Sequence, residues 1–262
     1  MVQKSIAPSE TGRTNDPART VAEILAVATQ EFAEKGLAGA RIDQIAQATR
    51  TSKRMIYYYF KSKDGLYQAV LEHAYRRMRD EEAHLKLEEM EPVAAIKRLV
   101  EFTYEHHRDN EDYIRLVMNE NIMKGHYLRQ IEGIKTLNQP AIESLRRVYQ
   151  QGVKSGVFRA GLDAVDIHAA ISALAFFNVS NRDTFGAIFD RAVDGDHAQT
   201  VSCAQFVDLI LRFVSLSGPK WGHPLVDGWL TGSLTGRKLF CVNAQSEFFG
   251  NVRQTLERVF CQ

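Results

Sequence analysis

The segment RIDQIAQATRTSKRMIYYYFKSKDGLY, residues 41–67, decides the fold of this chain. It divides into two short helical stretches, RIDQIAQA and KRMIYYYF, which TRTS separates, and a further helix begins at SKDGLY. Two short helices joined by a tight turn are typical of a helix-turn-helix unit. Between Arg41 and Lys63, six cationic side chains stand against a single carboxylate, that of Asp43. Cations interleaved with tyrosines on a small helical unit indicate a surface that binds nucleic-acid phosphates.

The residues around this segment carry the usual marks of helix ends. Asp16 followed by Pro17 predicts the start of a first helix, and Gly36 predicts its end. Ser52 and Ser62 are the expected N-caps of the third and fourth helices. The side chains expected inside this helical head are Val21, Ile24, Leu25, Ala28 and Phe32 of the first helix, Ile42, Ile45 and Ala46 of the second, and Ile56 and Phe60 of the third. Tyr59 is expected in the core beside Phe60.

The rest of the chain also shows helical periodicity, and no segment alternates with the period of a strand. We therefore predict an all-α protein. Helices are expected at 64–86, 92–108, 111–123, 131–155 with a break at Pro140, 163–181 with Asp163 as its N-cap, and 200–216. The predicted organisation is a disordered N-terminus at 1–15, a DNA-binding head at 16–65, a larger helical domain at 66–217 and a C-terminal extension at 218–262. Glycine-rich at first and amphipathic from Phe248 to Phe260, the extension is either an added terminal helix or a poorly ordered segment.

Composition and charge limit the classes of protein that fit this chain. Apolar residues make up 45% of its 262 residues and the net charge is +1, so binding to nucleic acid has to come from a local patch. Cys203, Cys241 and Cys261 have no metal-ligand spacing, and reduced thiols are expected. The N-terminus has no signal-peptide pattern, and the apolar run 169–179 is far shorter than the about 20 residues that cross a bilayer. We expect a cytoplasmic protein without a metal ion, a cofactor or a membrane partner.

Residues 18–70 resemble the helix-turn-helix of the TetR family of transcriptional regulators. The resemblance rests on Phe32 and Gly36, on Ile45-Ala46, on Ser52, and on the run Tyr57-Tyr58-Tyr59-Phe60 followed by Lys63 and Leu66. The later helices suit that family's ligand-binding and dimerisation domain as far as about residue 217. Two stretches, MNENIMKGHYLRQI and ISALAFFNVSNRDTFGAIF, resemble a subgroup that includes regulators of aromatic and N-heterocycle catabolism.

The turn departs from the family pattern. Family members often have Ala-Gly-Val there, whereas this chain has Thr49-Arg50-Thr51. A left-handed conformation without glycine costs about 1 kcal/mol, which a phosphate contact of Arg50 would offset.

The resemblance and the pattern together imply a set of DNA-binding residues. Lys53 and Arg54 stand at the start of the recognition helix, where side chains face base edges, and an arginine there can bind guanine through two hydrogen bonds. Lys63 is expected to hold a phosphate at the start of the fourth helix. The full candidate set is Arg41, Arg50, Thr51, Ser52, Lys53, Arg54, Tyr57, Tyr58 and Lys63. The alternative for each of them is a solvated surface side chain.

Three later helices change from apolar to polar side chains near one end, at 92–108, 111–123 and 163–181. Buried polar groups need hydrogen-bond partners, which a bound molecule can supply. A cavity for a small polar ligand, aromatic or carboxylate-bearing, is therefore expected to be lined by His107, Arg115, Asn121, Phe177, Asn178 and Asn181. Polar helix ends at the surface, or satisfied polar groups at an interface, are the other explanation.

These expectations favour a transcriptional regulator, most simply a repressor that a small-molecule effector releases from its operator. A homodimer on a pseudo-palindromic double-stranded operator follows from the small area of a single head, and the small residues at 169–175 permit close helix approach. An architectural DNA-binding protein without a ligand is one alternative. A helical enzyme using His106, His107, Glu120 and His126 is another, although the chain contains no HExxH, GxSxG, P-loop or GxGxxG motif.

Overall fold

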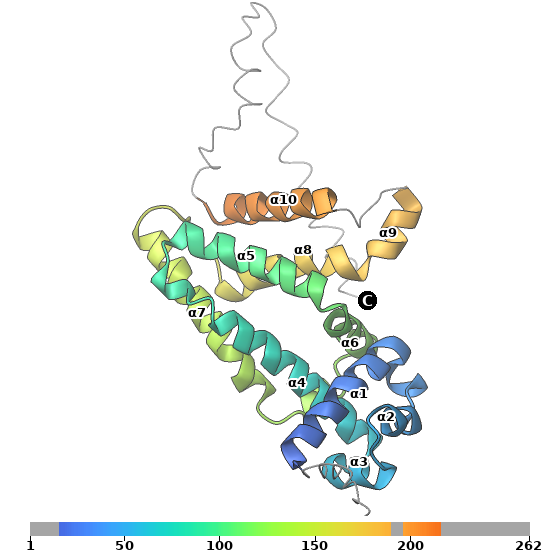
Figure 1. Ribbon diagram of the computed structural model, residues 1–262. Helices are drawn as coiled ribbons and strands as arrows, with labels where there is room; N and C mark the ends of the chain where they lie inside the picture. The colour runs from blue at the N-terminus through green and yellow to red at the C-terminus, as the bar shows by residue number, and fades with distance from the viewer. Residues whose placement is uncertain (1–15, 190–195, 216–262) are drawn as a thin grey trace, which may run out of the picture. The chain divides into compact units, whose positions relative to one another are not determined.

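The computed structural model describes residues 16–189 and 196–215, which form helices joined by short turns (Figure 1). Within these ranges there is no strand, and one isolated bridge joins Phe158 to Ser215. The all-α prediction is confirmed. The predictions for the N-terminus at 1–15, the extension at 218–262, Cys241 and Cys261 lie outside the described residues. In the part of the chain that the structure describes, no helix has the length and hydropathy needed to cross a membrane.

The N-terminal helices are α1 (Pro17–Gly39), α2 (Ile42–Ala48), α3 (Lys53–Phe60) and α4 (Lys63–Ala83). Their predicted caps are confirmed, because Asp16 accepts the amides of Ala18 and Arg19, and Ser52 and Ser62 each accept an amide of the turn that follows. Gly36 has a φ of 65° and ends the regular part of α1, as its sequence position predicts.

The later elements are the short 3₁₀ helix η1 (Leu87–Glu89), α5 (Pro92–Asp109), α6 (Glu111–Ile122), the 3₁₀ helix η2 (Leu128–Gln130), α7 (Ile134–Lys154), α8 (Ala164–Ser180), α9 (Arg182–Phe189) and α10 (Asp196–Val214). Asp163 caps α8 as predicted, accepting the amide of Val165. Helix α9 was not predicted, and α10 begins at Asp196, before the expected position.

The predicted break at Pro140 is wrong, because α7 continues through this residue. A proline inside a helix frees the carbonyl four residues earlier, here that of Thr136. Both Pro140 and Thr136 are exposed, so water can solvate the freed carbonyl and the helix need not end.

Two groups of buried apolar side chains stabilise these helices. The first joins the face Ile24, Ala28 and Phe32 of α1 to α2, α3 and the start of α4, and it continues to Leu116 of α6. The Asn119 side chain of α6 also donates to the Phe32 carbonyl, so α6 is tied to the helix-turn-helix unit. The second group joins α5, α7, α8 and α10, which lie against one another in Figure 1. Helix α4 contacts α1 near its start and α7 further along, so it links the two groups.

Candidate nucleic-acid interface and ligand cavity

The turn between α2 and α3 has the left-handed residue that the sequence requires. Arg50 has a φ of 51°. The Thr51 amide donates to the Ala46 carbonyl at 2.9 Å and the Arg50 amide to the Gln47 carbonyl at 3.2 Å, which is the Schellman arrangement of a helix C-terminus. The Thr49 side chain is buried and bonds back to Ile45. The turn therefore keeps the geometry usually given by glycine, and it presents an exposed arginine at its tip.

Most of α3 is exposed, although its middle is anchored by the fully buried Ile56. Tyr57 and Tyr58 are 43% and 67% exposed, large fractions for aromatic side chains. Tyr59 and Phe60 are half-buried and pack against the core beneath, as predicted. A helix held by one buried face and carrying tyrosines outward has the form of a helix that enters a DNA groove.

The two cations at the start of α3 differ in their surroundings. Lys53 forms an ion pair with Asp43 of α2. Arg54 is exposed, and among the described residues it has neither a hydrogen bond nor an ion pair. Ser52 uses its hydroxyl oxygen as the helix cap, accepting the Met55 amide at 3.2 Å. Of these three residues, Arg54 is the one whose side chain is free for an outside partner.

Arg41 and Lys63 flank the unit on either side. The Arg41 amide donates to Glu31 of α1 at 3.0 Å, and Lys35 donates to the same carboxylate at 2.7 Å. Burial opposes the ionisation of Glu31, but these two hydrogen bonds and the charges of Lys35 and Lys63 together outweigh it and hold the pKa of this carboxyl below its usual value. The hydrogen bond to Glu31 therefore fixes the backbone of Arg41, while the Arg41 side chain is exposed. Lys63 is half-buried and donates to the Ala38 carbonyl at 3.4 Å.

Gly65 supports the candidate interface and was not singled out by sequence analysis. Its amide donates to the Ser62 cap at 2.9 Å. A Cβ atom at this position would stand 2.2 Å from the Phe60 carbonyl oxygen, so only glycine allows α3 to approach α4 this closely. The close packing of the end of α3 against the start of α4 depends on this contact.

A cavity of about 410 Å³ lies where α4, α5, α6, α7 and α8 come together. Its lining consists of Tyr75, Met78, Arg79, His107, Tyr113, Val117, Asn121, Asn138, His168, Ala169, Ser172, Ala173 and Phe176. The predicted ligand residues His107 and Asn121 are among them. The other four, Arg115, Phe177, Asn178 and Asn181, do not line this cavity, so the prediction that all six meet in one place is wrong.

Those four side chains have other neighbours. Arg115 is exposed and paired with Glu111 on its own helix at 2.6 Å. Phe177 is half-exposed and packs edge-to-face on Phe185. Asn178 lies next to Tyr104, and Asn181 bonds to Ser180. The helical period places Phe177 and Asn178 on a different side of α8 from His168, Ser172 and Phe176, which line the cavity.

The cavity combines one cation with neutral polar groups. Burial, and after it the charges of His106 and Arg79, lower the pKa of His107 to about 3. Burial and Arg79 likewise lower the pKa of His168 to about 4. Both histidines are therefore neutral at pH 7, and Arg79 is the single charged side chain of the lining.

Glu120 and His106, two of the groups considered for catalysis, have structural surroundings. Glu120 is buried and accepts the amides of Tyr127 and Leu128 at 2.8 and 2.9 Å, which fixes the start of η2. His106 is buried beside Phe102, and burial lowers its pKa. Within residues 16–189 and 196–215, no three His, Cys, Asp or Glu side chains are grouped to hold a metal ion.

Comparison with known proteins agrees with this geometry. Residues 24–70 match the family model of bacterial regulatory proteins of the tetR family, and residues 92–210 match that of the tetracyclin repressor-like C-terminal domain. The HTH-type transcriptional repressor NicS of Pseudomonas putida is 32% identical over 76% of this chain and 94% of its own length. The chain belongs to the TetR family of transcriptional regulators. It is accordingly a DNA-binding transcription regulator and not an enzyme.

Other similar proteins match less of this chain or have a lower sequence identity. The HTH-type transcriptional repressor SCO4008 of Streptomyces coelicolor is 31% identical over 46% of this chain and 65% of its own length. Among solved structures, the transcriptional regulator SCO4942 of the same organism is 26% identical, with a TM-score of 0.57 over 74% of this chain and 98% of its own. A tetR-family protein from Rhodococcus RHA1, 18% identical with a TM-score of 0.59 over 75% of this chain and 97% of its own, shares the fold. Members of this family bind operator DNA and typically act as dimers with small-molecule effectors.

Proposed function

We propose that this protein is a repressor that binds a pseudo-palindromic operator as a homodimer and leaves it when a small molecule fills the cavity between α4 and α8. Repression is the activity named for the relatives NicS and SCO4008. The chromosome lies in the cytoplasm, so the protein is proposed to act there.

The observation that carries this proposal is the course of α4. Its first residue, Lys63, lies beside the recognition helix α3, and Tyr75, Met78 and Arg79 of the same helix line the cavity. A helix transmits a displacement along its axis because its backbone is hydrogen-bonded throughout. A ligand that prefers one position of Tyr75, Met78 and Arg79 therefore also prefers one position of α3. By reciprocity, operator DNA weakens ligand binding by the factor by which the ligand weakens DNA binding.

On DNA, the exposed residues take different parts. Arg54 is proposed to read a base edge, since it is exposed at the start of α3 and has no partner within the described residues. Lys53 is proposed to act beside it after leaving Asp43. Ser52 is proposed to act indirectly, by capping the start of α3. Phosphate contacts are proposed for Arg41, Arg50, Thr51, Tyr57, Tyr58 and Lys63.

The second copy is proposed to pack on the exposed apolar side chains of the last helices. Phe177 of α8 and Leu209 of α10 are 50% and 51% exposed, and Ile188 and Phe189 of α9 are 72% and 62% exposed. Large apolar side chains gathered at the surface of one region are typical of a protein–protein interface. A two-fold dimer would place two copies of α3 on the same face of the duplex.

Selection of binding sites from a random double-stranded library tests the proposal, because it requires no known operator sequence. The expected result is one enriched sequence with two inverted half-sites, whose centres lie about 10 base pairs or a multiple of this apart. Enrichment of a single half-site would contradict the dimer, and no enrichment at all would favour the architectural alternative. The variant Arg54→Ala should select a different sequence, whereas Arg77→Ala, an exposed change in the middle of α4, should select the wild-type sequence.

A further inference from the structure

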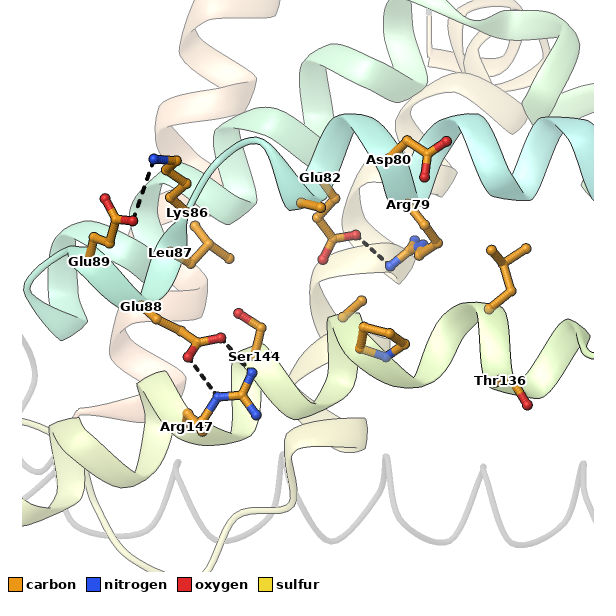
Figure 2. A pocket seen from close by; sticks show the side chains of 14 residues that line it. Arg79, Asp80, Glu82, Lys86, Leu87, Glu88, Glu89, Thr136, Ser144 and Arg147 are labelled. Atoms are coloured by element: carbon orange, nitrogen blue, oxygen red, sulfur yellow. Dashed lines mark hydrogen bonds and ion pairs between the residues drawn. The ribbon is translucent and has the colours of Figure 1, made fainter.

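Arg79 lines two cavities. One is the cavity of about 410 Å³ described above, and the other is a cavity of about 710 Å³ between the end of α4, η1 and α7. Figure 2 shows the second one, with Arg79 and Glu82 side by side on α4 and joined by a dashed line, and with Thr136, Ser144 and Arg147 on α7. Glu82 lines only the second cavity, so the ion pair of Arg79 and Glu82 stands at the boundary between the two.

The hydrogen bonding of Arg79 is incomplete. Its side chain is 10% exposed, and its Nη1 atom pairs with Glu82 Oε2 at 2.5 Å. Its Nε atom is buried without a hydrogen-bond partner. A guanidinium presents parallel N–H groups that match both oxygens of a carboxylate, and a buried donor left without a partner is costly. An acceptor that also reached the Arg79 Nε atom would therefore satisfy this guanidinium better than Glu82 alone does.

The position of Glu82 is unfavourable for a charged carboxylate because it is buried. Its side chain is 6% exposed. Burial raises its pKa above the usual value, and the Arg79 charge only partly opposes this. An ion pair whose attraction only partly offsets the desolvation of its carboxylate contributes little to stability, so a second anion can compete with Glu82 for Arg79.

We propose that Arg79 anchors the anionic group of the effector, and that Glu82 occupies this position at Arg79 while the smaller cavity is empty. This inference rests on the proposed function and names the ligand class of its cavity. The ligand is a small monocarboxylate with a compact, flat apolar body. Its body lies among Met78, Val117 and Phe176, and Asn121, Asn138 and Ser172 are available to its polar substituents.

The charge of the cavity supports a monoanion over other ligands. His107 and His168 remain neutral at pH 7, so a second negative charge would have no cation to meet. When the ligand carboxylate binds Arg79, Glu82 turns toward the larger cavity. That side carries the ion pair of Glu88 with Arg147, which joins η1 to α7. The effector thereby changes the contacts of α4 with α7.

The experiment compares carboxylates with their neutral amides on the full-length protein. Benzoate and benzamide form one pair, and cyclohexanecarboxylate and cyclohexanecarboxamide form a second; binding is measured by titration calorimetry at neutral pH. Wild-type protein should bind the acids at least about tenfold more tightly than the amides, as expected for a charge-assisted hydrogen bond. Glu82→Gln keeps the shape of the side chain and removes the competing charge, so it should raise the affinity for the acids about tenfold. Arg79→Gln should abolish the preference for acids.

Arg77→Gln is the matched control, since Arg77 is an exposed arginine of α4 outside this cavity and should leave all four affinities unchanged. Equal binding of acids and amides, an unchanged acid affinity in Glu82→Gln, or no binding to either wild type or Glu82→Gln would overturn the inference. If Arg79→Gln does not fold, the acid affinity of Glu82→Gln still tests the inference. Operator binding is measured on the same samples, and its absence in wild type would refute the proposed function while leaving the carboxylate result standing.

Discussion

Acidification from pH 8 to pH 5 is expected to destabilise the protein through two buried histidines of the cavity. His107 is 5% exposed and its pKa is lowered from 6.5 to about 3, chiefly by burial and then by the charges of His106 and Arg79. The pKa of His168 is lowered to about 4 by burial and Arg79. Because both pKa values are lower in the folded state, the unfolded chain binds protons more readily, so stability is lost as the pH falls below about 6.5.

The magnitude follows from linkage. At pH 5 the pH lies about 1.5 units below the unfolded pKa and above both folded values, and each unit is worth about 1.4 kcal/mol. Each histidine then removes about 2 kcal/mol from the free energy of unfolding. Glu82 acts in the opposite direction, because its folded pKa is raised and its protonation favours the folded state. His106, whose pKa burial also lowers, adds to the loss, so a single variant is needed to isolate one contribution.

Urea unfolding followed by circular dichroism at pH 8 and pH 5, at one protein concentration, measures the effect. His107→Gln should reduce the difference in unfolding free energy between the two pH values by about 2 kcal/mol. His73→Gln, which changes an exposed histidine of α4, should retain the wild-type difference. The reasoning is refuted if His107→Gln shows the same loss on acidification as the wild type.

Four further variants test the DNA surface, the turn geometry and the dimer. Lys63→Ala should weaken binding to all DNA sequences and lower the slope of log affinity against log salt by about one, whereas an unchanged slope in anisotropy titrations argues against a phosphate contact. Arg54→Ala should cost about 1 to 3 kcal/mol on the preferred site and little elsewhere, and a uniform loss on all sequences counts against base reading. Gly65→Ala places a Cβ atom against the Phe60 carbonyl oxygen and should lower stability by about 2 kcal/mol in thermal unfolding, where a wild-type midpoint would contradict the close approach. Leu209→Glu should give a folded monomer in sedimentation, and a persistent dimer would exclude this residue from the interface.

The local features of the fold were readable from the sequence because they depend on neighbours along the chain. Ser52, Ser62 and Asp163 are followed by amides that a short side chain can reach in any helix start. The left-handed Arg50 stands at the position where family members often have glycine. The fate of the helix at Pro140 was not readable in this way, because it depends on whether the freed Thr136 carbonyl faces water, which the packing of α7 decides.

The cavity was predicted only in part, since its lining depends on how five helices approach one another. The change from apolar to polar side chains pointed to His107 and Asn121 but gave no means of choosing between two sides of α8. The same change exists on α4, where Tyr75 and Met78 precede Arg79 and Glu82. The same criterion, applied to α4, would have indicated Arg79 as a cavity residue. The roles of these side chains in binding remain predictions.

Fluorescence anisotropy of the purified full-length protein tests the central claim most directly. The probe is duplex DNA from upstream of the protein's own gene, and scrambled DNA is the competitor. The salt concentration is held at about 150 mM because DNA affinity depends steeply on it. The account predicts a preference of about a thousandfold or more for the upstream DNA, and release of that DNA on addition of an effector that binds the cavity. Equal affinity for both DNAs, or an effector that binds the cavity without changing DNA affinity, would contradict it.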